Sequence, residues 1–422
     1  MKKNFLENIP WHDELTKKNA DIELPDYREA NAHIHTPYSF SSFDSMDTLF
    51  RQAREEEIAV LGINDFFVAD GYETFHNGCV RNRIFPLFNI EFIGLLKEEQ
   101  KKGIRINDPN NPGRIYLCGK GLDYPFSLNW WLRRKLKNVI RENQNQIKAM
   151  IDRLNRLIEQ VNPALVLSYG EIRTRFAKNL VRERHLAKAL RSLAVDNYEK
   201  AGDQVEFIES LYNGKKVKAA ISDQAAMENE IRSNLLKAGG PAFVGENEKS
   251  FPSLEMLIRI IIKAGGIPCY PVLLDDASGK LTEFEADMEK LYSSLSSAGI
   301  GCIELIPSRN DPSMLENCTE YFNEKGFIVT FGTEHNTPDL APLAITSRGS
   351  IPLKENLRKT AWEGACVIAA HQYLRTHGRQ GYVLDDGTLC VDQKNDLAAL
   401  GRNVIEYFLN NSQHESGNKG VN

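Results

Sequence analysis

Ala30-Asn31-Ala32-His33-Ile34-His35-Thr36-Pro37-Tyr38-Ser39 is a short apolar run that ends in two histidines separated by one residue. Side chains of a β-strand alternate between its two faces, so His33 and His35 would lie on the same face. Two imidazoles at this spacing can bind one divalent metal ion, and such an ion activates water at neutral pH. A pair of solvated or core histidines is the alternative interpretation, and the rest of the chain favours the metal site.

Apolar runs of this kind recur along the chain, and several are followed by segments with helical periodicity, such as 45–57 and 72–82. Repeated alternation of strand and helix indicates a parallel sheet, and seven strands indicate a barrel that closes on itself. We therefore predict an α/β fold, a distorted seven-stranded (β/α) barrel with a helical insertion. The predicted strands are 30–34, 59–64, 84–91, 114–118, 266–270, 301–306 and 327–331.

A charged, mostly helical stretch separates the fourth predicted strand from the fifth, with long amphipathic segments at 142–160 and 180–194. The tail lacks apolar residues that could anchor it, so we predict that it is disordered. The predicted division is 1–127 for the N-terminal part of the barrel, 128–249 for a helical insertion subdomain, 250–410 for the C-terminal part with its closing helices, and 411–422 for the tail.

The composition restricts the class of protein. The chain has 422 residues, 42% of them hydrophobic, and a net charge of −5, which argues against general affinity for nucleic acid without excluding a local basic groove. No segment has the pattern of a signal peptide or a membrane span, so we expect no membrane partner. Seven cysteines without a Cys-x-x-Cys motif are typical of reduced thiols, which predicts a cytoplasmic protein. The sequence leaves the oligomeric state open.

Polar residues follow nearly every predicted strand. In a parallel α/β barrel, the catalytic groups gather at the carboxyl ends of the strands. The convergence of histidines, carboxylates and tyrosines on one mouth predicts a metal site there. The residues at these ends are His33, His35, Asp65, Glu91, Tyr116, Tyr270, Glu304, Glu334 and His335.

These motifs together resemble those of the polymerase-and-histidinol-phosphatase (PHP) superfamily of metal-dependent phosphoesterases, in matching order from about residue 30 to 345. The resemblance implies a distorted seven-stranded barrel with metals at its carboxyl mouth. The matching segments are His33-Ile34-His35-Thr36, Gly62-Ile63-Asn64-Asp65-Phe66, Asn89-Ile90-Glu91, Arg184-His185-Leu186, Ala264-Gly265-Gly266-Ile267-Pro268-Cys269-Tyr270-Pro271 and Gly332-Thr333-Glu334-His335-Asn336-Thr337-Pro338.

The chain departs from the pattern of this superfamily at several ligand positions. Non-matching residues are Phe40, Phe66, Tyr116, Tyr270 and Asn336, while Glu334 replaces an aspartate. The resemblance leaves His33, His35, Glu91 and Glu334 as metal ligands, with His335 as a further candidate. This reduced set predicts one or two ions of Mn²⁺, Zn²⁺ or Fe²⁺ rather than three.

The other candidate residues have predicted roles around this ion. Asp65 would accept a proton or orient a ligand, and Tyr116 and Tyr270 would donate hydrogen bonds to a substrate oxyanion, because a phenol with a pKa of about 10 is a poor metal ligand. Glu304 would orient a histidine. Arg182, Arg184 and His185 are predicted to form a cluster that contacts phosphate. The alternative is that they lie on a solvated helix surface.

Three functions are compatible with these residues. The first is a metal-dependent hydrolase, a phosphoesterase acting on a small phosphorylated substrate through metal-activated water. The second is a catalytically silent binding protein with at most one structural metal. The third is a nuclease, against which the acidic charge balance argues.

Overall fold

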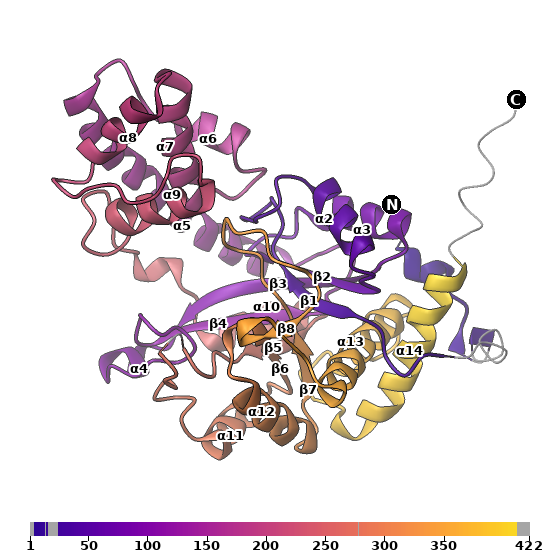
Figure 1. Cartoon of the computed structure of the whole chain (residues 1–422). Coiled ribbons are helices and arrows are strands. Elements are labelled where there is room, and N and C mark those ends of the chain that lie inside the picture. The colour runs from indigo at the N-terminus through magenta and orange to yellow at the C-terminus, as the bar shows by residue number, and fades with distance from the viewer. Residues whose placement is uncertain (1–3, 13, 16–23, 277, 412–422) are drawn as a thin grey trace, which may run out of the picture.

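The computed structural model describes residues 4–12, 14–15, 24–276 and 278–411 (Figure 1). Its centre is a seven-stranded sheet with the strands in chain order. The strands are β1 (Ala30–Ile34), β2 (Val60–Phe66), β3 (Phe85–Leu95), β4 (Arg114–Lys120), β5 (Ile267–Pro271), β6 (Cys302–Leu305) and β7 (Ile328–Phe331).

Strand β4 runs against both of its neighbours. The pairs β1–β2, β2–β3, β5–β6 and β6–β7 are parallel, whereas β3–β4 and β4–β5 are antiparallel. The expectation of a wholly parallel sheet is therefore wrong at β4. A parallel pair needs a crossover that returns the chain to the starting end of the sheet. Residues 96–113 instead supply the short helix α4 (Lys97–Lys101), and the chain re-enters the sheet where β3 ends.

The sheet closes almost completely between β1 and the chain that follows β7. Ile34 and Glu334 form a parallel bridge. The backbone N–H of His35 donates to the carbonyl of Glu334 at 2.7 Å, and the N–H of Glu334 donates to the carbonyl of His33 at 2.9 Å. This closure confirms the predicted α/β class and the distorted seven-stranded barrel.

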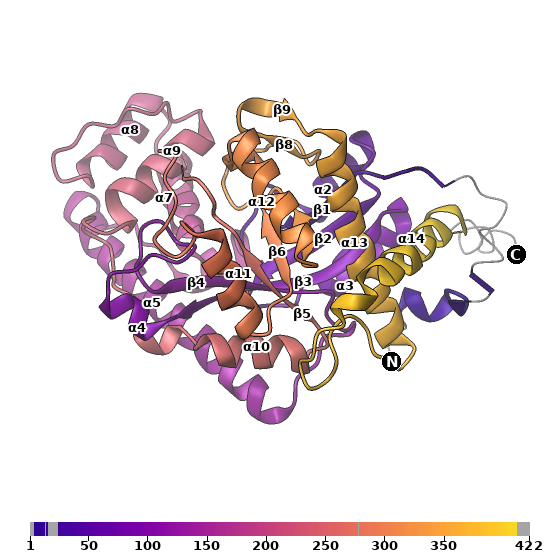
Figure 2. The same ribbon diagram turned by 90° about the horizontal axis from the view of Figure 1, so that it is seen from below.

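Helices cover the outside of the barrel (Figures 1 and 2). Helix α13 packs against β7 and β1 and carries α14 on its outer side, while α10 packs against β4 and β5. The bounds are α2 (Met46–Glu55), α3 (Tyr72–Asn82), α10 (Leu254–Lys263), α11 (Met288–Ser297), α12 (Pro312–Glu324), α13 (Glu355–Thr376) and α14 (Lys394–Asn411).

Side-chain caps fix where several of these helices begin. Ser45 accepts a hydrogen bond from the backbone N–H of Thr48 at the start of α2, and Ser253 caps α10 in the same way. Asp311 accepts from the N–H groups of Ser313 and Met314 at the start of α12, whose first residue is a proline. These caps satisfy backbone donors that have no partner inside the helix.

The segment between β4 and β5 is helical and has a hydrophobic core of its own, formed by residues from Ile147 to Ala242. In Figure 1, α5 leads away from the barrel and α6–α9 lie beside it. The predicted helices at 142–160 and 180–194 overlap α5 and α7; the subdomain boundaries themselves stay a prediction. The helices are α5 (Trp130–Val161), α6 (Tyr169–Arg175), α7 (Glu183–Asn197), α8 (Ala201–Ser210), α9 (Gln224–Ile231) and the π-helical turn η2 (Arg232–Leu236).

Short elements complete the chain. Among the described residues, no helix combines the length and apolar character needed to cross a bilayer.

The predicted disordered tail falls, apart from Asn411 at the end of α14, outside the described residues. The short elements are η1 (Phe5–Asn8), η3 (Glu248–Ser250), η4 (Pro307–Arg309), β8 (Thr346–Ser347), η5 (Arg348–Ser350), β9 (Ile351–Pro352) and η6 (Val391–Gln393).

The close contact of α13 and α14 gives a testable prediction. A Cβ at Gly401 would collide with the backbone of Cys366, whereas Gly202 on α8 has open space around it. Gly401→Ala should lower the free energy of unfolding by about 1–3 kcal/mol, because overpacking forces the two helices apart. The control Gly202→Ala should leave stability unchanged or raise it by up to about 1 kcal/mol. Equal urea midpoints for Gly401→Ala and the wild type would contradict this packing.

Candidate metal centre and adjoining cavity

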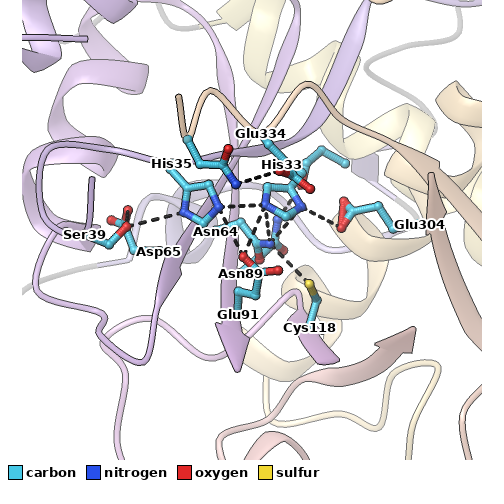
Figure 3. A network of polar contacts seen from close by, with 12 residues as sticks. His33, His35, Ser39, Asn64, Asp65, Asn89, Glu91, Cys118, Glu304 and Glu334 are labelled. Carbon is cyan, nitrogen blue, oxygen red and sulfur yellow. Dashed lines mark hydrogen bonds and ion pairs between the residues drawn. The ribbon is translucent and has the colours of Figure 1, made fainter. Parts of the chain in front are cut away.

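The two histidines of the opening motif lie side by side in the interior of the barrel, and both are fully buried. Their Nε2 atoms are 3.3 Å apart. Glu91 reaches them from β3, with its Oε2 at 3.1 Å from His35 Nε2 and 3.8 Å from His33 Nε2 (Figure 3). The structure thus brings together three of the predicted metal ligands.

The spacing of these three atoms fits a single divalent ion. Nitrogen and oxygen ligands at about 2.0–2.2 Å from one ion lie roughly 3.0–3.5 Å from each other. Two of the three observed separations, 3.1 and 3.3 Å, fall in this range, and the third is 3.8 Å. Glu91 Oε2 is buried and makes no hydrogen bond with any described residue. A buried carboxylate oxygen without a donor indicates a place for a cation.

Burial also sets the protonation of these groups. It lowers the pKa of His35 to about 4, so the ring is neutral and can offer a lone pair. Burial raises the pKa of the Glu91 carboxyl, although the nearby His33 opposes this effect. The ionised form of Glu91 is therefore costly unless a cation lies beside it.

His33 is oriented by a chain of buried polar groups that reaches β6 and β4. Its Nδ1 lies 2.8 Å from Glu304 Oε1, and Glu304 Oε2 accepts a hydrogen bond from Lys120 Nζ at 2.6 Å. A carboxylate at Nδ1 assigns the ring proton to that nitrogen and leaves the Nε2 lone pair toward Glu91. The expected contact of Glu304 with a histidine is present, and its role in orienting the ring stays a prediction. The Asn64 amide nitrogen also contacts the ring, at 2.9 Å from both nitrogens.

His35 is oriented by a second chain that ends at Asp65. Ser39 Oγ lies 3.4 Å from His35 Nδ1 and donates to Asp65 Oδ1 at 2.6 Å. Thr36 donates to the same carboxyl through its N–H at 2.8 Å and its hydroxyl at 2.5 Å. Asp65 is fully buried, which raises its pKa. Asp65 was predicted either to accept a proton or to orient a ligand. These contacts suit the orienting role, which stays a prediction.

Glu334 and His335 do not join the cluster of His33, His35 and Glu91. The Glu334 carboxylate pairs with both terminal nitrogens of Arg309, at 2.8 Å for Nη1–Oε1, and accepts from Asn336 at 2.6 Å. Burial alone would raise the pKa of Glu334, but Arg309 lowers it below its ordinary value. His335 uses both ring nitrogens, toward Thr333 Oγ1 at 2.7 Å and the Ala341 carbonyl at 2.9 Å, so neither is free for a metal.

A cavity of about 680 Å³ opens beside the centre. Glu91 and Phe66 form part of its wall, so the cavity reaches the candidate metal position. Charged groups from the barrel and from the helical segment meet across it. They are Glu91, Asp108, Arg114, Arg182, Glu183, Arg184, Arg232, Lys237, Asp275, Asp276, Arg309, Glu334 and Arg348.

Arg182 stands over the centre on the cavity side. Its guanidinium carbon lies 4.0 Å from the centroid of the Phe66 ring. Phe66 in turn stacks on His35, with 4.6 Å between the ring centroids and 16° between the ring planes. Within the described part of the chain, the Arg182 guanidinium has neither an ion pair nor a hydrogen bond, whereas Arg309 is paired with Glu334. Arg182 is therefore an arginine at the cavity that no carboxylate pairs with among the described residues.

The other two residues of the predicted phosphate cluster are placed differently. Arg184 lines the cavity, donates to Asn229 Oδ1 at 3.2 Å, and has its pKa lowered to about 10 by burial and by the neighbouring Arg232. His185 is buried outside the cavity lining, and its Nδ1 accepts the backbone N–H of Arg182 at 2.9 Å. Burial lowers the pKa of His185 to about 3, so it is neutral.

The two tyrosines lie on opposite faces of the sheet. Tyr116 lines the cavity because the antiparallel direction of β4 places its first residues at the mouth. Tyr270 is fully buried in the core outside the barrel and donates to Glu285 at 2.8 Å. The role predicted for Tyr270 as a donor to substrate stays a prediction without support from this geometry.

Two residues at the site went unnoticed in the sequence, Lys120 and Arg309. Lys120 could have been found from alternation, since Tyr116, Cys118 and Lys120 share one face of β4. Arg309 follows β6 in the short helical turn η4, where no periodicity indicates the direction of a side chain.

Comparison with known proteins gives similarity to solved structures only. No family model and no curated protein matches the chain. A solved structure from Bifidobacterium adolescentis, assigned as a metal-dependent phosphoesterase, superposes with a TM-score of 0.50 at 16% identity, over 80% of this chain and 96% of the other. An amidohydrolase from Chromobacterium violaceum, with bound sulfate and no metal, superposes with a TM-score of 0.49 at 14% identity, over 79% and 96%. The first likeness shows a shared fold.

The cluster predicts which histidines hold a metal. His33→Ala or His35→Ala should abolish stoichiometric divalent metal, because each removes one of three converging ligands, while far-UV circular dichroism stays unchanged. His335→Ala is the matched control and should retain the metal, since its ring nitrogens are already engaged. Elemental analysis of purified proteins measures the metal. Wild-type metal content in both His33→Ala and His35→Ala would refute this assignment.

Proposed function

We propose that the chain is a metal-dependent phosphoesterase that acts on a small phosphorylated substrate in the cavity beside Glu91. The observation that carries this proposal is the balance of charge among three buried carboxylates. Glu304 is paired with Lys120 and Glu334 with Arg309. Among the described residues, Glu91 has only the two histidines within ion-pair distance, so its ionised form needs a cation at its side.

His33, His35 and Glu91 would hold this ion, for which Mn²⁺, Zn²⁺ and Fe²⁺ all accept two imidazoles and a carboxylate. When bound, the ion supplies a Lewis acid for the phosphoryl oxygen and lowers the pKa of a water molecule to about 7. Three protein ligands leave coordination positions open, and the cavity lies on the side where Glu91 and Phe66 form the wall.

Arg182 is suited to bind the phosphate. Its guanidinium lies over the Phe66 ring and has its donors available, so it can make charge-assisted hydrogen bonds to a phosphate. Arg184 adds positive charge to the same wall, and Tyr116, which also lines the cavity, would donate a hydrogen bond to a substrate oxygen. The cavity volume of 680 Å³ is typical of sites for small molecules.

A catalytically silent binding protein is the alternative, and one experiment separates the two. Purified protein should contain one divalent ion and should hydrolyse some members of a panel of small phosphate monoesters and diesters when Mn²⁺, Zn²⁺ or Fe²⁺ is supplied. Chelation followed by dialysis should remove the activity, and adding the metal back should restore it. Metal binding without any hydrolysis across the panel would favour the binding protein, and hydrolysis of oligonucleotides alone would favour the nuclease.

The stacked arginine gives a kinetic prediction. Arg182→Met should lower kcat/KM by roughly 10- to 150-fold, because a hydrogen bond to a charged group contributes about 1.5–3 kcal/mol. Metal content should not change. Arg175→Met serves as the control, since Arg175 is exposed on α6 and paired with Asp196 outside the cavity lining. Unchanged kinetics in Arg182→Met would remove this residue from the phosphate site.

A further inference from the structure

Lys120 is a lysine inside the barrel with no exposed surface. Its ammonium donates to Glu304 Oε2 at 2.6 Å and to the backbone carbonyl of Ala32 at 3.1 Å. Taking an ammonium out of water is costly unless a carboxylate compensates it. Lys120 therefore depends on Glu304, and the same carboxylate is the acceptor for His33.

A second group of potential ligands surrounds this position. His33, Cys118 and Glu304 each offer an atom, and these atoms lie within 4.8 Å of one another. The geometry argues against a metal there, because His33 Nδ1 and Glu304 Oε1 are already 2.8 Å apart and Lys120 occupies the other oxygen of Glu304. A divalent ion would have to displace both contacts and would lie beside an ammonium. Repulsion between the two cations would be strong in this buried environment.

We propose that Lys120 is a positioning residue whose ammonium takes the place of a second metal ion. It holds Glu304 where that carboxylate accepts the His33 Nδ1–H, and this keeps His33 Nε2 directed at Glu91. The centre is thereby restricted to one divalent ion. This inference rests on the proposed function only in taking His33 as a metal ligand.

The first test measures metal binding with Zn²⁺ alone, by titration calorimetry and elemental analysis. Wild type should bind one ion. Lys120→Met removes the cation and keeps the length of the side chain, so the Kd should rise by roughly 10- to 100-fold, as is usual when a group that orients a metal ligand is lost. The double variant Lys120→Met/Glu304→Gln removes both charges, and the introduced amide oxygen can still accept from His33, so most of the affinity should return.

The second test needs neither metal nor turnover. The ¹⁵N chemical shifts of His33 in the metal-free wild type should show a protonated Nδ1 and an unprotonated Nε2. In Lys120→Met this preference should weaken, and in the double variant it should return. A purely structural role for Lys120 would change the melting temperature without moving this signature. This test is independent of the proposed function, because a protein without phosphatase activity would still show the same tautomer of His33.

Several outcomes would overturn the inference. They are an Nε2-protonated His33 in the metal-free wild type, an unchanged Kd in Lys120→Met, and two zinc ions in the wild type that fall to one in Cys118→Ser. By contrast, Cys118→Ser with one ion and an unchanged Kd supports it. If Lys120→Met does not fold, the wild-type tautomer and stoichiometry, together with the affinity of the double variant, decide the question.

Discussion

The barrel of this protein is closed by a few backbone hydrogen bonds between β1 and the chain after β7, and the candidate centre depends on them. The carbonyl of His33 accepts from the N–H groups of Thr333 and Glu334, at 3.1 and 2.9 Å, and the N–H of His35 donates back at 2.7 Å. These bonds fix the backbone on both sides of Ile34. The two imidazoles therefore face the interior, where β3 and β6 supply Glu91 and Glu304.

The chain after β7 follows an unusual path to make this closure. Glu334 and His335 both have positive φ, 61° and 55°, a conformation that non-glycine residues adopt rarely. The turn directs the Glu334 carboxylate to Arg309, while the His335 ring stacks on Phe43 at 4.9 Å. Of the two residues predicted as ligands, Glu334 thus lines the cavity, and His335 packs outside its lining.

The sequence was sufficient to predict the barrel and its opening motif, because the apolar runs are short and each ends in a polar group. It could not give the direction of β4, which follows from the connection between β3 and β4, whose helix α4 is too short to form a crossover. The sequence also could not show which residues of β5 point toward the barrel interior. Every residue from Ile267 to Tyr270 is buried, so no polar alternation distinguishes the two faces, and Cys269 rather than Tyr270 points toward the interior with Cys302. Pairing between distant residues, such as Glu334 with Arg309, leaves no local pattern.

The charges around the centre are consistent with a site for one metal ion. Lys120 neutralises Glu304 and Arg309 neutralises Glu334, so two positions that could attract metal are already satisfied by side chains. Glu91 contributes one uncompensated negative charge, and a divalent ion beside it leaves an excess of one positive charge. Arg182, held on Phe66 without a partner among the described residues, adds another. A phosphate monoester carries about −1.5 to −2 charges near neutral pH. On the proposed function, one divalent ion with Arg182 and Arg184, which forms no ion pair among the described residues, more than balances Glu91 and the phosphate, so a second ion would add a further excess of positive charge.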